Sequence, residues 1–134
     1  MSLSDIVARN ISRVARDLDW SSHDLAKHAK IAPRTALQVL KGDYKRGADL
    51  ATIEAVAESM RISPAPLMFD KVPTNVLISR RLDRLIKNYI SMDATAREEL
   101  EEFLEEIIER QVQREEAAHR EVKVAAEKMK ARAV

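Results

Sequence analysis

Basic side chains are concentrated between residues 27 and 46, where their chemistry suits a partner that carries negative charge. The stretch contains six bases and one acid, Asp43. The bases are Lys27, Lys30, Arg34, Lys41, Lys45 and Arg46. The net charge of the whole chain is only +1, because acids are concentrated elsewhere, with seven Glu and no base in residues 98–109. The pattern indicates a local basic surface of the kind that meets phosphates.

No set of residues indicates an enzyme, a metal site or a cofactor. The chain has no Cys, and His23 and His28 are five residues apart, whereas two metal ligands on one helix face are four apart. The Glu residues of 98–109 lack the Gly turn of a calcium loop and are typical of a solvated helix face. No nucleophile lies beside a base, and two Gly are too few for a phosphate loop. We therefore expect no catalytic residue, no cofactor and no metal.

The composition favours an all-α fold. Hydrophobic residues make up 46% of the chain and charged residues 34%, but aromatic residues only 4%, and there are two Gly. Sheets with tight turns need more of both, whereas the abundant Ala, Leu, Glu, Arg and Lys are good helix formers. The N-terminal segment carries charges throughout, unlike a signal peptide, and no stretch is apolar for long enough to span a membrane. We expect a cytoplasmic protein that makes no contact with membranes.

Hydrophobic periodicity and capping residues divide residues 1–70 into five helices. The strongest local signal is a capping-box pattern at Ser21 and Asp24, flanked by Trp20 and Leu25 at the positions of a hydrophobic staple. The expected helices cover 3–18, 21–29, 33–41 (starting at Pro33 and stopping before Gly42), a segment capped by Asp49, and a short segment after Ser63-Pro64.

The remaining residues predict a helical extension that joins two copies of the chain. Residues 71–75 are expected to form a linker and 76–90 an amphipathic helix. Asp93 caps the last helix, whose pattern of four- and three-residue steps resembles that of a coiled coil, although its later positions are mostly Ala, Val or polar. The pattern runs through Leu100, Leu104, Ile107, Gln111, Ala118, Val122, Ala125 and Met129. We expect residues 76–134 to form a C-terminal helical hairpin or long helix that frays toward its end, with a homodimer formed through 76–129.

The helices expected at 21–29 and 33–41 are separated by only three residues. Two helices joined so tightly cannot lie in line, and burying the apolar residues of both makes them cross steeply. Small Ala26 allows a close approach, Ile31 fills the turn, and Val39 anchors the second helix. In this arrangement the second helix projects from the surface, so it can enter the major groove of DNA.

At these residues the sequence resembles the phage-repressor-like helix-turn-helix proteins, often called the XRE family. The resemblance covers residues 3–69, about half of the chain, with five helices in the family's order. Its centre is SSHDLAKHAKIAPRTALQVLKG, and the following DLATIEAVAESMRISPAPLMF is similar to the family's fourth and fifth helices. The resemblance implies a five-helix lambda-repressor-like DNA-binding domain over residues 1–70, in a sequence-specific transcriptional regulator.

The resemblance also implies which side chains would contact DNA. The family's base-contacting positions correspond to Pro33, Arg34, Thr35 and Gln38. Arg34 can donate two hydrogen bonds to guanine, Gln38 can pair with adenine, and Thr35 can offer its hydroxyl or touch a thymine methyl. A phosphate contact of the family, at the start of the preceding helix, corresponds to Ser22. Further phosphate contacts are expected beyond the second helix at Lys41, Lys45 and Arg46.

The chain departs from the family at several positions. Lys30 stands where the family commonly has Gly or another small residue, so a left-handed turn there would be costly. Pro33 stands where a polar base contact is common, which leaves base contacts to the residues that follow. Leu40 and Leu37 are apolar where many members are polar. We expect Leu40 in the core, whereas Leu37 either faces thymine methyls or packs.

A dimeric repressor of prophage, mobile-element or toxin–antitoxin type, bound to an inverted repeat, fits these features best. The alternative is a protein-interaction module that engages a partner protein through the long C-terminal helix, with the helix-turn-helix as scaffold. Two interpretations also remain for a basic group in 76–90, which either extends the DNA contact or, as is more common, pairs with the Glu-rich helix that follows. These residues are Arg80, Arg81, Arg84 and Lys87.

Overall fold

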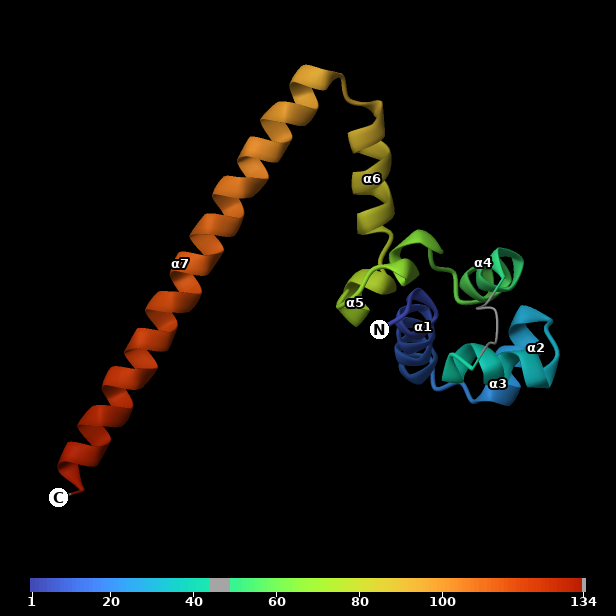
Figure 1. Ribbon diagram of the computed structural model, residues 1–134, viewed down its shortest axis with the longest axis horizontal. Helices are drawn as coiled ribbons and strands as arrows, with labels where there is room; N and C mark the ends of the chain where they lie inside the picture. The colour runs from blue at the N-terminus through green and yellow to red at the C-terminus, as the bar shows by residue number, and fades with distance from the viewer. Residues whose placement is uncertain (44–48, 134) are drawn as a thin grey trace. The chain divides into compact units, whose positions relative to one another are not determined.

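The computed structural model describes residues 1–43 and 49–133, and every regular element within them is helical (Figure 1). The elements are α1 (Leu3–Asp17), α2 (Ser22–Ala29), α3 (Pro33–Lys41), α4 (Leu50–Ser59), the 3-10 helix η1 (Ala65–Met68), α5 (Thr74–Leu77), α6 (Arg81–Ser91) and α7 (Ala94–Arg132). The chain forms two compact units, Met1–Asn88 and Tyr89–Val134. The all-α class is thus confirmed for the described residues.

Side chains cap the helices where the sequence predicted. The Ser21 hydroxyl accepts a hydrogen bond from the backbone N–H of Asp24 at 3.2 Å, and the Asp24 carboxylate accepts one from the N–H of Ser21 at 2.8 Å. The predicted caps Asp49 and Asp93 accept bonds from the first turns of α4 and α7 at 2.7 and 2.8 Å. Each bond satisfies an N–H that has no partner within its helix. Ser2 heads an equivalent capping box on α1, which the sequence analysis did not identify.

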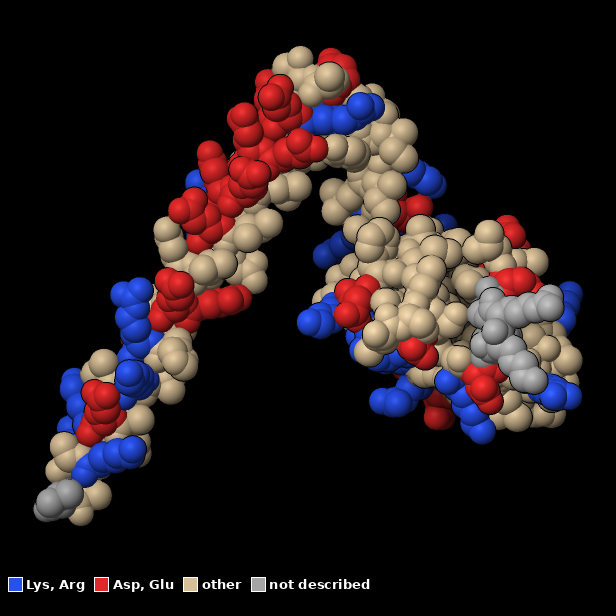
Figure 2. Space-filling model, in the orientation of Figure 1, with Lys and Arg blue, Asp and Glu red and all other residues tan. Residues whose placement is uncertain are grey.

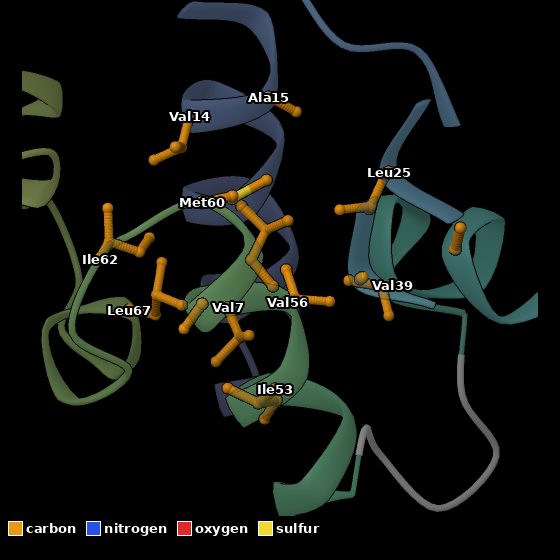
Figure 3. Close-up of a cluster of buried hydrophobic side chains, with 14 of the residues drawn as sticks. Val7, Val14, Ala15, Leu25, Val39, Ile53, Val56, Met60, Ile62 and Leu67 are labelled. Atoms are coloured by element: carbon orange, nitrogen blue, oxygen red, sulfur yellow. The ribbon is translucent and has the colours of Figure 1, made fainter. Parts of the chain in front are cut away.

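The core of the first unit collects apolar side chains from α1 to α5 and η1. Figure 3 shows side chains of these helices in one cluster, with Val14, Leu25, Val39 and Val56 contributed by four different helices. Each of the four is at most 1% exposed. Burying a side chain of this size stabilises the fold by about 1.5–3 kcal/mol relative to exposure. The packing of α1 and α2 against α3, and of α2 against α4, follows from this shared core.

Three helices end at a left-handed residue that is followed by a hydrophobic one. The left-handed residues are Asp19, Lys30 and Arg61, with φ of 57°, 55° and 57°. The hydrophobic residues after them are Trp20, Ile31 and Ile62, whose N–H groups donate to carbonyls of the preceding helix at 2.8, 3.1 and 3.0 Å. All three hydrophobic side chains pack in or against the core. This packing offsets the left-handed conformation, including the one at Lys30, and accompanies such helix ends generally.

The segment after residue 70 differs from the expected linker and helix. α5 begins inside the expected linker, and residues 78–80 separate it from α6, so the prediction of one helix over 76–90 is wrong. The physical reason is tertiary packing. Leu77 is 1% exposed within the core, and Val72 packs against that core. The anchoring of Leu77 makes residues 71–77 part of the first unit, which extends to Asn88.

α7 makes up most of the second unit and is an uninterrupted helix of 39 residues. At 1.5 Å per residue it is about 58 Å long. Arg97 donates hydrogen bonds of 3.1 Å to the carbonyls of both Tyr89 and Ile90, which fastens the start of α7 to the last residues of α6. The helix continues to Arg132, where the sequence pattern indicated fraying, and none of its residues is buried.

Candidate nucleic-acid interface

Four side chains of α3 share the face of the helix that points away from the core. Arg34, Leu37, Gln38 and Lys41 occupy positions i, i+3, i+4 and i+7 of one helix face, here named the outward face of α3. Arg34 and Lys41 are exposed, Leu37 is 43% exposed, and Gln38 is half-buried. Within residues 1–43 and 49–133, no carboxylate forms an ion pair with Arg34 or Lys41. The face therefore presents unpaired positive charge, one amide and one apolar side chain.

The opposite face of α3 holds the helix in place. Ala36 and Val39 are 0% and 1% exposed and belong to the core, and Leu40 packs against it as expected. Both α1 and α2 pack on α3, and Ala26 of α2 is a small buried residue that leaves room for the crossing. Because α1 and α2 pack against the buried face of α3, the outward face has a defined position on the first unit.

The C-terminal end of α3 is attached to α1 by a hydrogen bond and lies close to α1 at Gly42. The hydroxyl of Ser12 donates a 3.0 Å hydrogen bond to the carbonyl of Leu40, which lies in the last turn, where carbonyls lack helical partners. Gly42 ends the helix with φ of 69°, as predicted. A Cβ added at Gly42 would lie 3.2 Å from the Cβ of Ala8, so a side chain there would press on α1.

The N-terminal end of α3 carries the remaining predicted base contacts. Pro33 is the first residue of the helix and is exposed, and Ala32 before it supplies no side-chain cap. The start of α3 therefore lacks the carboxylate found at the starts of α2, α4 and α7. Thr35 is half-buried and already has an interaction within the chain. Of the predicted base contacts, Pro33 and Arg34 are thus the most accessible, and Thr35 and Gln38 are partly covered.

The predicted phosphate contact Ser22 lies next to a negative charge. Ser22 is the first residue of α2 and is half-buried. Hydrogen bonds from the backbone N–H and the hydroxyl of Ser21 lower the pKa of Asp24 below its usual 3.8, so this carboxylate is ionised at neutral pH. Its charge already complements the dipole of α2. A phosphate at Ser22 would approach Asp24, so nearby bases must supply most of the attraction.

Several bases near α3 can supply that attraction. Lys41 lies on the outward face, whereas Lys27 and Lys30 are exposed on α2 and at its end. No ion pair involves these three lysines in the described part of the chain. The predicted phosphate contacts Lys45 and Arg46 lie outside the described residues.

A buried polar cluster that the sequence analysis missed supports the first unit. Asn10 of α1 is 0% exposed, and its amide donates hydrogen bonds of 2.9 Å to the carbonyls of Leu67 and Phe69. Its side-chain oxygen accepts a 2.7 Å bond from Arg13, which also donates to the carbonyl of Val72. The chain after α4 is thereby fastened to α1, the helix that also supports α3. A polar residue on the apolar face of an expected helix was the signal that could have revealed it.

His28 takes part in an aromatic stack. The ring of His28 stacks on Trp20, with ring centroids 4.2 Å apart and an angle of 5° between the planes. In residues 1–43 and 49–133, no group of three or more His, Cys, Asp or Glu side chains is placed to hold a metal ion. The stack instead fixes an exposed imidazole at the surface of α2.

Comparison of the chain with known protein families, with curated proteins and with solved structures found no match. Over the described part of the chain, no helix combines the length and the apolar composition needed to cross a membrane. What the first unit does must therefore follow from the chemistry of its own surface, above all from the outward face of α3.

Proposed function

We propose that the protein is a sequence-specific double-stranded DNA-binding transcriptional regulator that places α3 in the major groove. The observation that carries the proposal is the outward face of α3, where Arg34 and Gln38 lie one turn apart. The opposite face of this helix packs in the core against α1 and α2. A guanidinium can donate two hydrogen bonds to O6 and N7 of guanine, and a carboxamide can pair with N6 and N7 of adenine. The major groove is wide enough to admit a helix.

The other residues of this end of α3 complete the proposed base contacts. Leu37 is 43% exposed, so it does not belong to the core, and its side chain can touch a thymine methyl. Thr35 can present its hydroxyl or methyl to a base edge, and Pro33 can make an apolar contact. The proposed base-contacting set is Pro33, Arg34, Thr35 and Gln38, with Leu37 added from its exposure.

Binding strength in this proposal comes from local charge and from symmetry. The net charge of +1 supplies no long-range attraction to DNA, so phosphate contacts by Lys41 and its neighbours must supply it locally. A homodimer doubles these contacts and binds an inverted repeat whose half-sites are about 34 Å apart, or a multiple of that distance. The role proposed is that of a dimeric repressor of prophage, mobile-element or toxin–antitoxin type.

In vitro selection from random double-stranded DNA tests the proposal. The full chain should enrich one inverted repeat, and binding to it is then measured at fixed salt. We expect Arg34→Ala to weaken binding about 10- to 100-fold and to relax selection at one base pair of each half-site. Gln38→Ala should do the same at a different base pair, because the two side chains lie one turn apart.

The matched control is Arg16→Ala, which removes the same charge from an exposed position on α1. Its effect on the selected site and on unrelated DNA should be equal and small, because Arg16 lies outside the outward face of α3 and the attraction of its charge to phosphates is not sequence-specific. Enrichment of no sequence, or full binding by the double variant Arg34→Ala/Gln38→Ala, would overturn the proposal.

A second candidate function rests on α7. Its apolar side chains are exposed, among them Phe103 at 54% and Val122 at 67%. Such a surface favours a protein partner, and the first unit would then serve as a scaffold. The selection experiment separates the two candidates, since a scaffold enriches no DNA sequence.

A further inference from the structure

Eight positions along one face of α7, all apolar except Gln111, mirror each other about the middle of the helix. They follow steps of four, three and four residues from Leu100 to Gln111, and the same steps from Ala118 to Met129. The centre of this pattern lies between residues 114 and 115. A helix that runs antiparallel to an identical copy presents its own pattern in reverse, so only a symmetric pattern places apolar residues opposite each other along the whole contact.

In an antiparallel pair, the side chains that lie opposite each other have sizes that together fill each layer of the contact. Opposite one another lie Leu100 and Met129, Leu104 and Ala125, Ile107 and Val122, and Gln111 and Ala118. In three of these layers a larger side chain of the first half meets a smaller one of the second half, and Leu100 meets Met129, which is of similar size. A parallel pair would instead place Ala against Ala at two layers and leave that half poorly filled.

Charge is divided along α7 in the way that antiparallel pairing needs. The first half, residues 94–109, carries seven Glu and one base, Arg97. The second half, residues 110–132, carries seven bases and four Glu. Figure 2 shows acidic side chains along the first half and basic ones toward the C-terminal end. Opposite halves attract in an antiparallel pair, whereas a parallel pair would place the Glu-rich halves side by side.

Effects within a single helix do not account for this division. The helix dipole favours acids in the first turn and bases in the last turn, and its influence ends there. The Glu residues continue to Glu109, four turns from the start of α7. Ion pairs within the helix join Glu106 to Arg110 and Glu116 to Arg120, each at 3.7 Å, and leave most of the Glu residues unpaired in the described chain.

We infer that α7 pairs with the α7 of a second copy of this chain in antiparallel orientation, with its centre between residues 114 and 115. The exposed side chains of Leu104, Ile107, Val122 and Met129 are covered in this pair. Leu104 lies opposite Ala125 of the second copy. The N-terminal ends of the two α7 helices are then about 60 Å apart. The inference gives the proposed homodimer its contact surface, but it concerns α7 alone, and its test contains no DNA.

Disulfide cross-linking of the full chain tests the orientation, because the chain has no Cys of its own. One preparation carries Leu104→Cys and a second, marked by a size tag, carries Ala125→Cys. Antiparallel pairing predicts a cross-linked dimer of the two different chains after mixing and oxidation, and no dimer from either chain alone. A cross-link within the Leu104→Cys preparation would show a parallel pair and overturn the inference.

The matched control is a mixture of Glu105→Cys and Val124→Cys chains. In the antiparallel pair these two positions lie at the same level along the two helices. Each is on the side of its helix that faces away from the other helix, so no cross-link is expected. Sedimentation of the unmodified chain should give twice the monomer mass of 15.2 kDa. A chain that sediments as a monomer would overturn the inference and the proposed dimeric state, but not the major-groove contact proposed for α3.

Discussion

The hydroxyl of Ser12 on α1 donates a 3.0 Å hydrogen bond to the carbonyl of Leu40 in the last turn of α3. This bond joins a residue from the interior of one helix to the end of the helix that carries the outward face. It attaches that end of α3 to α1. The position of the proposed DNA contact therefore depends on a residue that does not itself face DNA.

We predict that Ser12→Ala lowers the free energy of unfolding by about 1 kcal/mol, because the carbonyl of Leu40 loses a half-buried partner. Urea unfolding followed by circular dichroism measures the change. Ser4→Ala on the same helix is the control, since the hydroxyl of Ser4 has no bond within residues 1–43 and 49–133, and it should change stability by less than about 0.5 kcal/mol. Equal effects of the two variants would show that the bond to Leu40 contributes nothing.

We predict opposite effects of replacing Gly42, at the C-terminal end of α3, and of introducing a glycine at Lys30, at the C-terminal end of α2. Gly42→Ala should destabilise the fold by about 1–2 kcal/mol, because φ there is 69° and the new Cβ would press on Ala8 of α1. Lys30→Gly should stabilise it by up to about 1 kcal/mol, because Lys30 already holds a left-handed conformation with φ of 55°. Thermal unfolding of both variants checks the two signs, and a stabilising Gly42→Ala would contradict the strain assigned to that end.

The local signals of this fold could be predicted from the sequence, because each involves residues close together in the chain. These signals are the capping box at Ser21 and Asp24, the helix start at Pro33 and the helix end at Gly42. Each depends only on residues within one or two helical turns. The outward face of α3 could be predicted for the same reason, since its residues follow helical spacing. The exposure of Leu37 could not, because it depends on which helices cover α3.

The features that could not be predicted depend on tertiary contacts. The break between α5 and α6 exists because Leu77 is buried in the core, and the hydrophobic periodicity of 76–90 contains no sign of that burial. The left-handed Lys30 is likewise tolerated because Ile31 packs against the core. Asn10 finds its carbonyl partners more than fifty residues away in the chain.

We predict that the cap of α2 makes stability depend on pH at the acid end. Hydrogen bonds from Ser21 lower the pKa of Asp24 in the folded chain, so the folded state favours the ionised carboxylate. This contribution is fully present above the pKa of the unfolded chain, at about pH 4, and is lost as the pH falls through the lowered folded pKa. Unfolding free energies measured between pH 5 and 2 should therefore decline less steeply in Asp24→Asn than in the unmodified chain.

The control for this pH dependence is Ser21→Ala, which keeps the carboxylate but removes the hydroxyl that donates to it at 2.9 Å. The free energy of unfolding of this variant should decline with falling pH more steeply than that of Asp24→Asn and less steeply than that of the unmodified chain. Asp5 and Asp49 also have lowered pKa values at helix starts, so some decline persists in every variant. An unchanged slope in Asp24→Asn would show that the cap does not discriminate between the two protonation states.

We predict that Asn10→Ala lowers the free energy of unfolding by about 2–3 kcal/mol. The variant leaves the carbonyls of Leu67 and Phe69 without their donor and removes the oxygen that Arg13 contacts, all in a site with little access to water. Asn75→Ala, at an exposed position, is the control and should change stability by less than about 0.5 kcal/mol. A small effect of Asn10→Ala would mean that the chain after α4 is held by apolar packing alone, and that Leu67 and Leu77 suffice to place it against α1.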